Sequence, residues 1–266
     1  MKKPVLETAG YAGAKADFAM KTAILITARL KSTRLPGKVM KKIKNRPMIS
    51  HMLDRLRMAQ RPEEIIICTS TVAQDDPLEE LAKLENVHCF RGHPDDVLQR
   101  LTKAAEKYEV DTVVSCTADN PFVDPEYIDH LVYFHHSQGN DYSNVDGLPF
   151  GTFSYALSYP AMVRACQIKD KTDTEVWGGY FTKTGKFKVG TLKVTDLDLR
   201  RPGLRLTVDT PEDFDLVNRI FDALYKPGKV FTLKEIVALC DEHPELVRIN
   251  AYVQQKPSKP IRVKSV

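Results

Sequence analysis

The regular alternation of short apolar runs with amphipathic stretches is the feature that most restricts the fold of this chain. The runs TAILIT, EIIICTS and TVVSCT are rich in apolar and β-branched residues, which is typical of strands buried on both faces. The stretches between them gather apolar residues on one helical face, as in PMISHMLDRLRMAQ. This alternation predicts an α/β fold with three layers, in which a mainly parallel sheet lies between helices. Strands are expected at Thr22–Thr27, Glu64–Ser70, Val87–Phe90, Thr112–Thr117 and Leu204–Asp209.

Several helix ends carry local signals. Asp124 and Thr210 each stand directly before a proline, so both are predicted to cap the helices that these prolines begin. Gly139 is expected to end the first of these helices, because glycine adopts the left-handed conformation of a helix C-terminus without strain. Thr232 lies three residues before Glu235, which is the spacing of a capping box for the last helix.

The 266 residues are enough for one large domain with a substantial core. We predict a single domain over 21–256, with a substrate-side insertion at about 141–195, where short extended pieces mix with glycine and proline. Residues 1–20 have no apolar core of the kind that a secretory signal needs, and they are expected to form an unstructured extension. The basic, proline-bearing segment 257–266 is expected to be a mobile tail. No apolar run approaches the roughly 20 residues of a membrane span.

The five cysteines are far apart and form no C-x-x-C pair. Their odd number and mostly apolar neighbours predict reduced core thiols in a cytoplasmic protein. The histidines lack the spacing of zinc ligands, so a zinc site is not expected.

The segment ARLKSTRLPGK, from Ala28 to Lys38, directly follows the first predicted strand and is strongly basic. No Asp or Glu occurs between Asp17 and Asp54. Guanidinium forks, ammonium groups, hydroxyls and backbone N–H groups are the donors that hold polyphosphates. The segment therefore predicts a phosphate-binding loop at the ligand edge of the sheet, although a solvated basic loop is the plain alternative. The donors are Arg29, Lys31, Ser32, Thr33, Arg34 and Lys38, with Gly37 allowing close approach of the backbone.

Two aspartates stand at the predicted ends of strands. Asp119 follows the strand TVVSCT, and Asp209 ends the predicted strand LRLTVD. Mg²⁺ prefers one or two carboxylates together with phosphate oxygens. Each acid alone fits a helix cap or a turn, and Asp124 and Asp213 are expected to be just that. Asp119 and Asp209 together, facing one basic loop, predict a metal and triphosphate site.

Other kinds of site lack their motifs. The basic loop does not have the spacing of a Walker A loop, and no G-x-S-x-G is present for a hydrolase nucleophile. Nucleic-acid binding is not expected, because the cations form one loop and not a long stripe with aromatics. Trp177, the only tryptophan, is predicted to be a lid or acceptor-pocket aromatic or an anchor between subunits, and the sequence does not choose between these.

Several segments of the chain resemble the motifs of a known family. ITARLKSTRLPGKVMKKIKNRPMI resembles the A-R-x-x-S-x-R-L-P-G-K signature of the cytidylyltransferases that make CMP-activated acidic sugars. FRGHPDDVLQR, TADNPFVDPEYIDHLV and LTVDTPEDFDLV look most like the spore-coat polysaccharide biosynthesis protein F branch. The resemblance implies a nucleotide-diphospho-sugar transferase (Rossmann-like) fold, a Mg²⁺-dependent reaction, CTP as donor, a small acidic acceptor and a homodimer.

The resemblance also implies roles for single residues. Arg29, Lys38 and Asp119 match catalytic positions of the family, and Asp119 and Asp209 match its metal ligands. The nucleotide-binding positions are matched by Ala28, Arg29, Ser32, Arg34, Lys38, Arg91 and Gly92, of which Ala28 and the Arg91–Gly92 segment correspond to the part that meets cytosine and ribose.

The predicted acceptor region departs from the family pattern. Where that branch usually has P-x-G-L-D-x-E-x-F, this chain has PFGTFSYAL, with Phe153 and Tyr155 in place of two acids. The family's E-H-V-T appears as EVWG, which keeps Glu175, lacks the histidine and contains Trp177. These four residues are expected to contact the acceptor. Cytidylyl transfer is the leading hypothesis, and a glycosyltransferase of the same fold or a catalytically altered nucleotide-binding protein are the alternatives.

Overall fold

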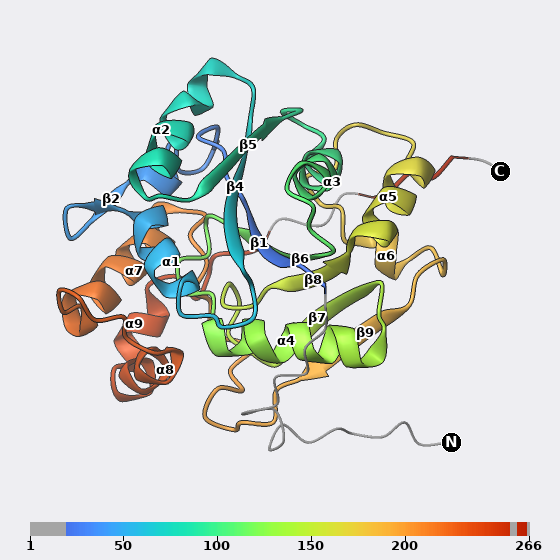
Figure 1. The fold of residues 1–266 in the computed structure, drawn as a ribbon. Coiled ribbons are helices and arrows are strands. Elements are labelled where there is room, and N and C mark those ends of the chain that lie inside the picture. The colour runs from blue at the N-terminus through green and yellow to red at the C-terminus, as the bar shows by residue number, and fades with distance from the viewer. Residues whose placement is uncertain (1–19, 256–259, 265–266) are drawn as a thin grey trace.

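A seven-stranded sheet forms the centre of the computed structural model, which describes residues 20–255 and 260–264. The strand order is β5-β4-β1-β6-β8-β7-β9, and β8 is the one strand of this sheet that runs against its neighbours (Figure 1). The predicted α/β fold with a mainly parallel sheet is therefore confirmed. The strands are β1 Thr22–Thr27, β4 Glu64–Ser70, β5 His88–Gly92, β6 Thr112–Thr117, β7 Tyr142–Asp146, β8 Tyr155–Ser158 and β9 Val189–Lys193.

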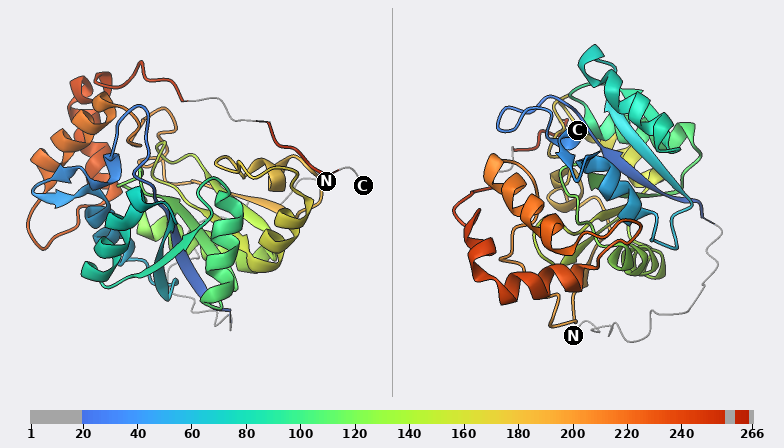
Figure 2. Two further views of the ribbon diagram at one scale, coloured as in Figure 1. Left: turned by 90° about the horizontal axis from the view of Figure 1, so that it is seen from above. Right: turned by 90° about the vertical axis from the view of Figure 1, so that its left-hand side faces the viewer.

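Helices cover both faces of the sheet and complete the three layers (Figures 1 and 2). Buried residues of α1, α2, α4, α7 and α8 share one apolar core, and those of α3, α5 and α6 share the other. None of the helices in the described residues is long and apolar enough to cross a bilayer. The helices are α1 Met48–Leu56, α2 Asp76–Leu84, α3 Val97–Lys107, α4 Pro125–Gln138, α5 Tyr159–Ile168, α6 Gly179–Thr182, α7 Pro211–Leu224, α8 Leu233–Glu242 and α9 Pro244–Arg248, and a small ribbon joins β2 Lys42–Ile43 to β3 Arg46–Pro47.

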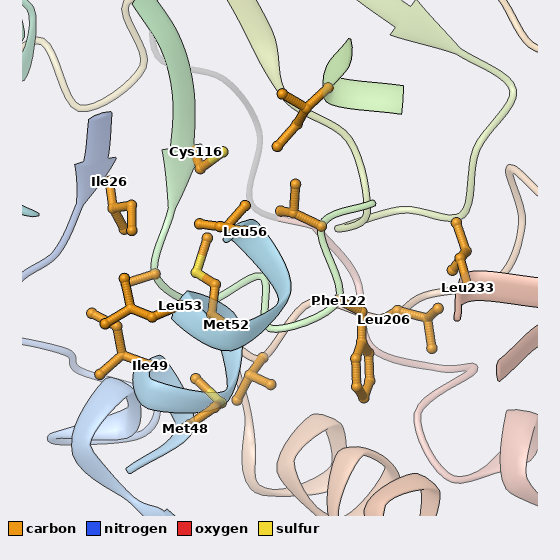
Figure 3. Close-up of a cluster of buried hydrophobic side chains, with 14 of the residues drawn as sticks. Ile26, Met48, Ile49, Met52, Leu53, Leu56, Cys116, Phe122, Leu206 and Leu233 are labelled. Carbon is orange, nitrogen blue, oxygen red and sulfur yellow. The ribbon is translucent and has the colours of Figure 1, made fainter. Parts of the chain in front are cut away.

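The pattern of β1 explains why its run is apolar throughout. Ile24 and Ile26 point into one core, whereas Ala23 and Leu25 point into the other. Alternate side chains of a strand face opposite sides of a sheet, so a strand between two cores needs apolar residues at every position. Figure 3 shows Ile26 beside the apolar side chains of α1.

The predicted helix caps are present. The Asp124 carboxylate accepts a hydrogen bond from the backbone N–H of Tyr127, and Gly139 ends α4 in the left-handed conformation. Thr210 and Asp213 form a reciprocal capping box at the start of α7, and α8 begins with the predicted capping box as well. The sequence TLKEIVALCDEHPEL forms two helices, however, because proline cannot supply the N–H that would continue α8 past Glu242.

The prediction of a strand over Leu204–Asp209 is wrong. This segment makes one isolated bridge, between Phe150 and Arg205, and does not join the sheet. Its backbone is paired instead with two loops: Leu206 N–H donates to Phe150 O, and Val208 N–H donates to Asp119 O, at 2.8 Å each. The alternation of LRLTVD is therefore that of an extended segment with loop partners, and Asp209 does not end a strand.

The segment 141–195, which the sequence predicts to be an insertion, forms part of the central sheet. It supplies β7, β8 and β9, so three of the seven strands of the central sheet come from it. Its strand β8 pairs antiparallel with β6, so the segment extends the sheet that β5, β4, β1 and β6 begin. The division of the chain into 1–20, 21–256 and 257–266 stays a prediction.

The ends of the chain are described in part. The predicted extension, apart from Met20, lies outside the described residues. Within the predicted mobile tail, 260–264 lie beside the end of α5, where Lys264 N–H donates to Ile168 O and Asp170 N–H donates to Arg262 O, both at 2.9 Å. These contacts give 260–264 a defined place.

The five cysteines are free, as the sequence predicts. Cys68, Cys116 and Cys240 are buried, and burial raises the pKa of the Cys240 thiol to about 11. A thiol with a raised pKa is a poor nucleophile near neutral pH, so the structure gives these cysteines a packing role.

We expect the stability of the protein to fall in mild acid because of His135. This side chain is buried beside Ser143, and burial, with a smaller contribution from His136, lowers its pKa to about 4. An unfolded histidine titrates near pH 6.5, so between about pH 6.5 and pH 4 the unfolded chain binds more protons than the folded one. The contribution of neutral His135 is complete above about pH 6.5 and is lost as the pH falls toward 4, by on the order of 3 kcal/mol.

Urea unfolding of the wild type and of His135→Asn checks this expectation. The difference in the free energy of unfolding between the two proteins should shrink between about pH 7.5 and about pH 5. A difference that stays constant over this range would contradict the assignment to His135.

Candidate functional site

The basic loop follows β1 and is held in place by a buried carboxylate. Asp75, which is almost fully buried, accepts a hydrogen bond of 2.7 Å from Leu30 N–H through one oxygen and bonds Ser70 Oγ through the other. Gly37 has a φ of 63°, a conformation that glycine adopts without strain, and its N–H donates to Leu30 O. The loop is thus closed at both ends before Lys38. The sequence does not predict this role of Asp75, because Leu30 lies 45 positions away along the chain.

Lys38 lies between the two aspartates that the sequence singles out. Its Nζ is 2.8 Å from Asp119 Oδ2 and 2.9 Å from Asp209 Oδ1, and it also donates to Val208 O at 2.7 Å. The Lys38 side chain is 13% exposed. Burial opposes the charge of Lys38, but attraction to Asp119 and Asp209 outweighs it, so the pKa of the ammonium is raised. The predicted meeting of the basic loop with both aspartates is therefore present in the structure.

Asp119 and Asp209 reach this place from different elements. Asp119 follows the end of β6, where Ala118 N–H donates to Thr27 O of the neighbouring strand β1. Asp209 is brought in by the segment that pairs with the Asp119 backbone, since Val208 N–H donates to Asp119 O. The site thus lies at the carboxyl edge of the parallel strands, although one of its acids comes from a loop.

Three cations surround Asp209. Besides Lys38, Arg34 Nη2 is 2.9 Å from Oδ1, and Arg205 Nη2 is 3.0 Å from Oδ2. Burial alone would raise the pKa of Asp209, but Lys38, Arg34 and Arg205 outweigh it and hold the pKa below the usual range. Asp209 is therefore ionised at neutral pH. The sequence did not predict Arg205, which has no motif of its own and meets Asp209 only through the fold.

Arg29 lies apart from the Lys38 cluster. Its Nη1 donates to Pro94 O at 2.6 Å, and its guanidinium is 3.4 Å from Asp95 Oδ1 and 3.9 Å from Glu175 Oε1. Three of the four predicted cations of the loop are thus divided between two places, with Arg34 and Lys38 at Asp209 and Arg29 at the loop after β5, and the fourth, Lys31, is exposed. Of the predicted hydroxyl donors, Ser32 Oγ accepts a hydrogen bond from Leu35 N–H within the loop.

The Arg91–Gly92 segment ends β5. The Arg91 side chain donates to Ser70 O and pairs with Glu79 and Asp76 at the start of α2, so its guanidinium is fully engaged. Gly92 has no room for a side chain, because a Cβ would lie 2.9 Å from Phe90 and from the buried Arg100. The Arg91 guanidinium therefore already has protein partners in this structure.

Three of the four residues predicted for the acceptor, Phe153, Tyr155 and Trp177, form a chain of ring contacts that begins at Phe150. The ring centroids of Phe150 and Phe153 are 6.0 Å apart, those of Phe153 and Tyr155 are 5.9 Å apart, and Tyr155 lies 5.9 Å from Trp177. Trp177 is 8% exposed and packs in the core of the α3–α5 side. Glu175 lies beside Arg29, as described above. The ring contacts therefore begin at Phe150, over which Arg205 lies, and end at Trp177 in the core.

The two carboxylates fit a divalent cation. Both already converge on one positive charge, the Lys38 ammonium, which takes the place of a cation between them. Among the described residues, no group of three or more His, Cys, Asp or Glu side chains forms a metal site. A pair of carboxylates suits Mg²⁺ in particular, because this ion usually combines one or two carboxylates with substrate phosphates and water.

Known proteins are similar to this chain in sequence and in fold. Spore coat polysaccharide biosynthesis protein SpsF of Bacillus subtilis is 28% identical over 228 residues, which cover 83% of this chain and 94% of that protein. The 3-deoxy-manno-octulosonate cytidylyltransferase of Geobacter metallireducens is 32% identical over 120 residues, or 42% of this chain and 44% of that protein. The structure of a cytidylyltransferase from Leptospira borgpetersenii covers 90% of this chain and 100% of that chain, with a TM-score of 0.78 and 26% identity.

A match to a family model shows to which family the chain belongs. A family model described as Cytidylyltransferase matches residues 23–241, which include the basic loop, Asp119 and Asp209. The match spans most of the chain and contains the whole cluster around Lys38. This protein therefore belongs to the cytidylyltransferase family of nucleotidyl-transferring enzymes.

Proposed function

We propose that this enzyme transfers CMP from CTP to a sugar acid, or to a related phosphate or phosphonate, and releases pyrophosphate with the help of Mg²⁺. The observation that carries the proposal is the position of Lys38 between Asp119 and Asp209 beside the basic loop. A triphosphate and one divalent cation together would satisfy all three groups, because the lysine pairs with phosphate and the carboxylates with the metal.

The reaction is a displacement at phosphorus. An oxygen of the acceptor attacks the α-phosphorus of CTP, and the bond from this phosphorus to the oxygen that bridges to the β-phosphate breaks. Arg34 and Lys38 hold the β- and γ-phosphates and stabilise the negative charge that grows on the leaving pyrophosphate, and Arg29, the third proposed phosphate ligand, contributes from its separate position beside Pro94. No protein base is required when the acceptor oxygen is already ionised. Arg34 and Lys38 now pair with Asp209, so substrate binding exchanges a carboxylate partner for phosphate.

Asp119 and Asp209 would hold Mg²⁺. When bound, the ion supplies positive charge that polarises the phosphate oxygens and offsets their repulsion of the acceptor. The preference for CTP as substrate is supported by the family to which the chain belongs.

The nucleoside and the acceptor are assigned to separate sets of residues. The backbone around Ala28 and Gly92, with Ser32, is proposed to contact the nucleotide. Phe153, Tyr155, Glu175 and Trp177 are proposed to contact the acceptor, although most of the surface of Trp177 is already covered by the core.

The biological setting is part of the proposal. The names of the spore coat and 3-deoxy-manno-octulosonate relatives support a role in the synthesis of surface polysaccharide or glycoconjugates. Five free cysteines support a reducing, cytoplasmic location. A homodimer remains part of the same proposal.

A screen for pyrophosphate release tests the proposed function. CTP and Mg²⁺ are incubated with the enzyme and with sugar acids, sugar phosphates and small phosphonates, and we expect release that depends on both acceptor and metal. A parallel thermal-shift panel of CTP, GTP, UTP and ATP measures the preference for the base. Sugar transfer from a finished nucleotide sugar without pyrophosphate would favour a glycosyltransferase. Stabilisation by CTP without turnover on any acceptor would favour a catalytically altered nucleotide-binding protein.

A further inference from the structure

A fully buried carboxylate lies behind the proposed metal site. Asp213 has no exposed surface, and its Oδ1 accepts hydrogen bonds from Arg205 Nε at 2.9 Å and from Asn250 Nδ2 at 2.8 Å. Its Oδ2 accepts from Arg205 Nη2 at 3.0 Å and from the backbone N–H groups of Asp209 and Thr210. Five donors on one carboxylate go far beyond the helix cap that the sequence predicts for Asp213.

These contacts fix the guanidinium of Arg205. Two of its nitrogens are bound by Asp213, and a third, Nη1, donates to Gln255 Oε1 at 3.1 Å. The guanidinium lies over the ring of Phe150, 5.6 Å from its centroid. A planar guanidinium that is held along one edge and stacked on a ring has almost no freedom to turn. The Arg205 side chain is 10% exposed, so water competes little for its donors.

Arg205 is also the partner of the proposed metal ligand Asp209. Its Nη2 donates to Asp209 Oδ2 at 3.0 Å, whereas Asp209 Oδ1 faces Lys38 and Arg34. The two oxygens of Asp209 therefore have separate surroundings. Because Arg205 occupies Oδ2, it is Oδ1 that points toward the Lys38 ammonium and, beyond it, toward Asp119.

We infer that Arg205, held by Asp213 and Asn250, is a positioning residue that sets the orientation of the Asp209 carboxylate for a divalent cation. The inference rests on the proposed function. A ligating carboxylate that is fixed by a hydrogen bond does not need to be ordered when the ion binds, and loss of such a partner lowers metal affinity by about 10- to 100-fold. Asn250 lies outside 23–241, the range that matches the family, so part of this support comes from beyond the matched domain.

Two variants that leave the net charge unchanged test the inference. Arg205→Lys keeps the positive charge near Asp209 but cannot form the forked contacts, and Asn250→Ala removes one donor from Asp213. Each is compared with a matched control from outside the Asp213 network. Arg201→Lys alters an exposed pair with Asp241, and Asn218→Ala removes a side-chain hydrogen bond to the α7 backbone.

The measurement is Mn²⁺ affinity in the presence of CTP, from the water proton relaxation rate, with folding checked by circular dichroism. We expect the wild type and both controls to bind Mn²⁺ equally. Arg205→Lys should bind it about 10- to 100-fold more weakly, and Asn250→Ala about tenfold more weakly. Folded variants that bind Mn²⁺ like the wild type would overturn the positioning role alone. A wild type that binds no Mn²⁺ with CTP would overturn the proposed metal site, and with it this inference.

Discussion

Replacing Asp119 by alanine is expected to lower the rate of pyrophosphate release from CTP by about 100-fold or more. Asp119 is one of the two carboxylates that meet at Lys38, and it is the one with fewer cationic partners. Its Oδ2 bonds Lys38, whereas Asp209 is paired with three cations. Its removal takes away a proposed metal ligand and leaves the Lys38 ammonium with one carboxylate. The loss should therefore appear mainly in kcat, because the transition state carries more charge at the phosphates than the substrate does.

A matched control separates this effect from a general loss of structure. Asp146 is the last residue of β7 in the same sheet, but it is exposed and pairs with Lys193 on the surface. Asp146→Ala should leave the rate within a factor of about two, since exposed pairs contribute little. Near-normal turnover by Asp119→Ala would contradict the metal assignment.

Replacing Asp213 by alanine is expected to cost about 3–5 kcal/mol of folding free energy, because it leaves the buried Arg205 charge without its main partner. The backbone N–H groups of Asp209 and Thr210 and the Asn250 amide lose their acceptor as well. Attraction to Arg205 and these hydrogen bonds outweigh burial, so the pKa of Asp213 lies below its usual range and the group is ionised in the folded protein.

Urea unfolding measures this cost against a close control. Asp215 lies two residues further along α7 and forms an exposed pair with Arg219 at 3.1 Å. Asp215→Ala should change the free energy of unfolding by less than about 1 kcal/mol. Equal effects of the two substitutions would show that the buried network adds no stability.

Local signals were enough to predict much of the fold. The run of β1 identifies a strand between two cores, and α4 is marked at both ends by Asp124 and Gly139, whose effects act within a few residues. The segment Leu204–Asp209 shows where such reasoning fails. Its alternation is real, but its hydrogen-bond partners are the loops at Phe150 and Asp119, and a sequence pattern does not state which segments will pair.

Some residues of the candidate site could be predicted from the sequence and others could not. The meeting of Lys38 with Asp119 follows from the rule that the ends of parallel strands share one edge of the sheet, together with the basic loop. Asp209 joins them through a segment that pairs with loops and not through a strand. The roles of Arg205 and Asn250 could not be predicted, because Asn250 meets Arg205 across 45 positions of chain and no spacing rule links the two residues. The separate position of Arg29 also depends on the loop after β5, which only the folded chain brings near.

The central claim is that Lys38 belongs to a triphosphate site. The most direct test is a calorimetric titration of CTP with Mg²⁺ into the wild type, Lys38→Met and Lys42→Met, where Lys42 is an exposed lysine on the β2–β3 ribbon. A charge-assisted hydrogen bond contributes about 1.5–3 kcal/mol, so Lys38→Met should bind CTP at least about tenfold more weakly than the wild type, and Lys42→Met should bind it equally well. Equal CTP affinity of the wild type and Lys38→Met would contradict the account.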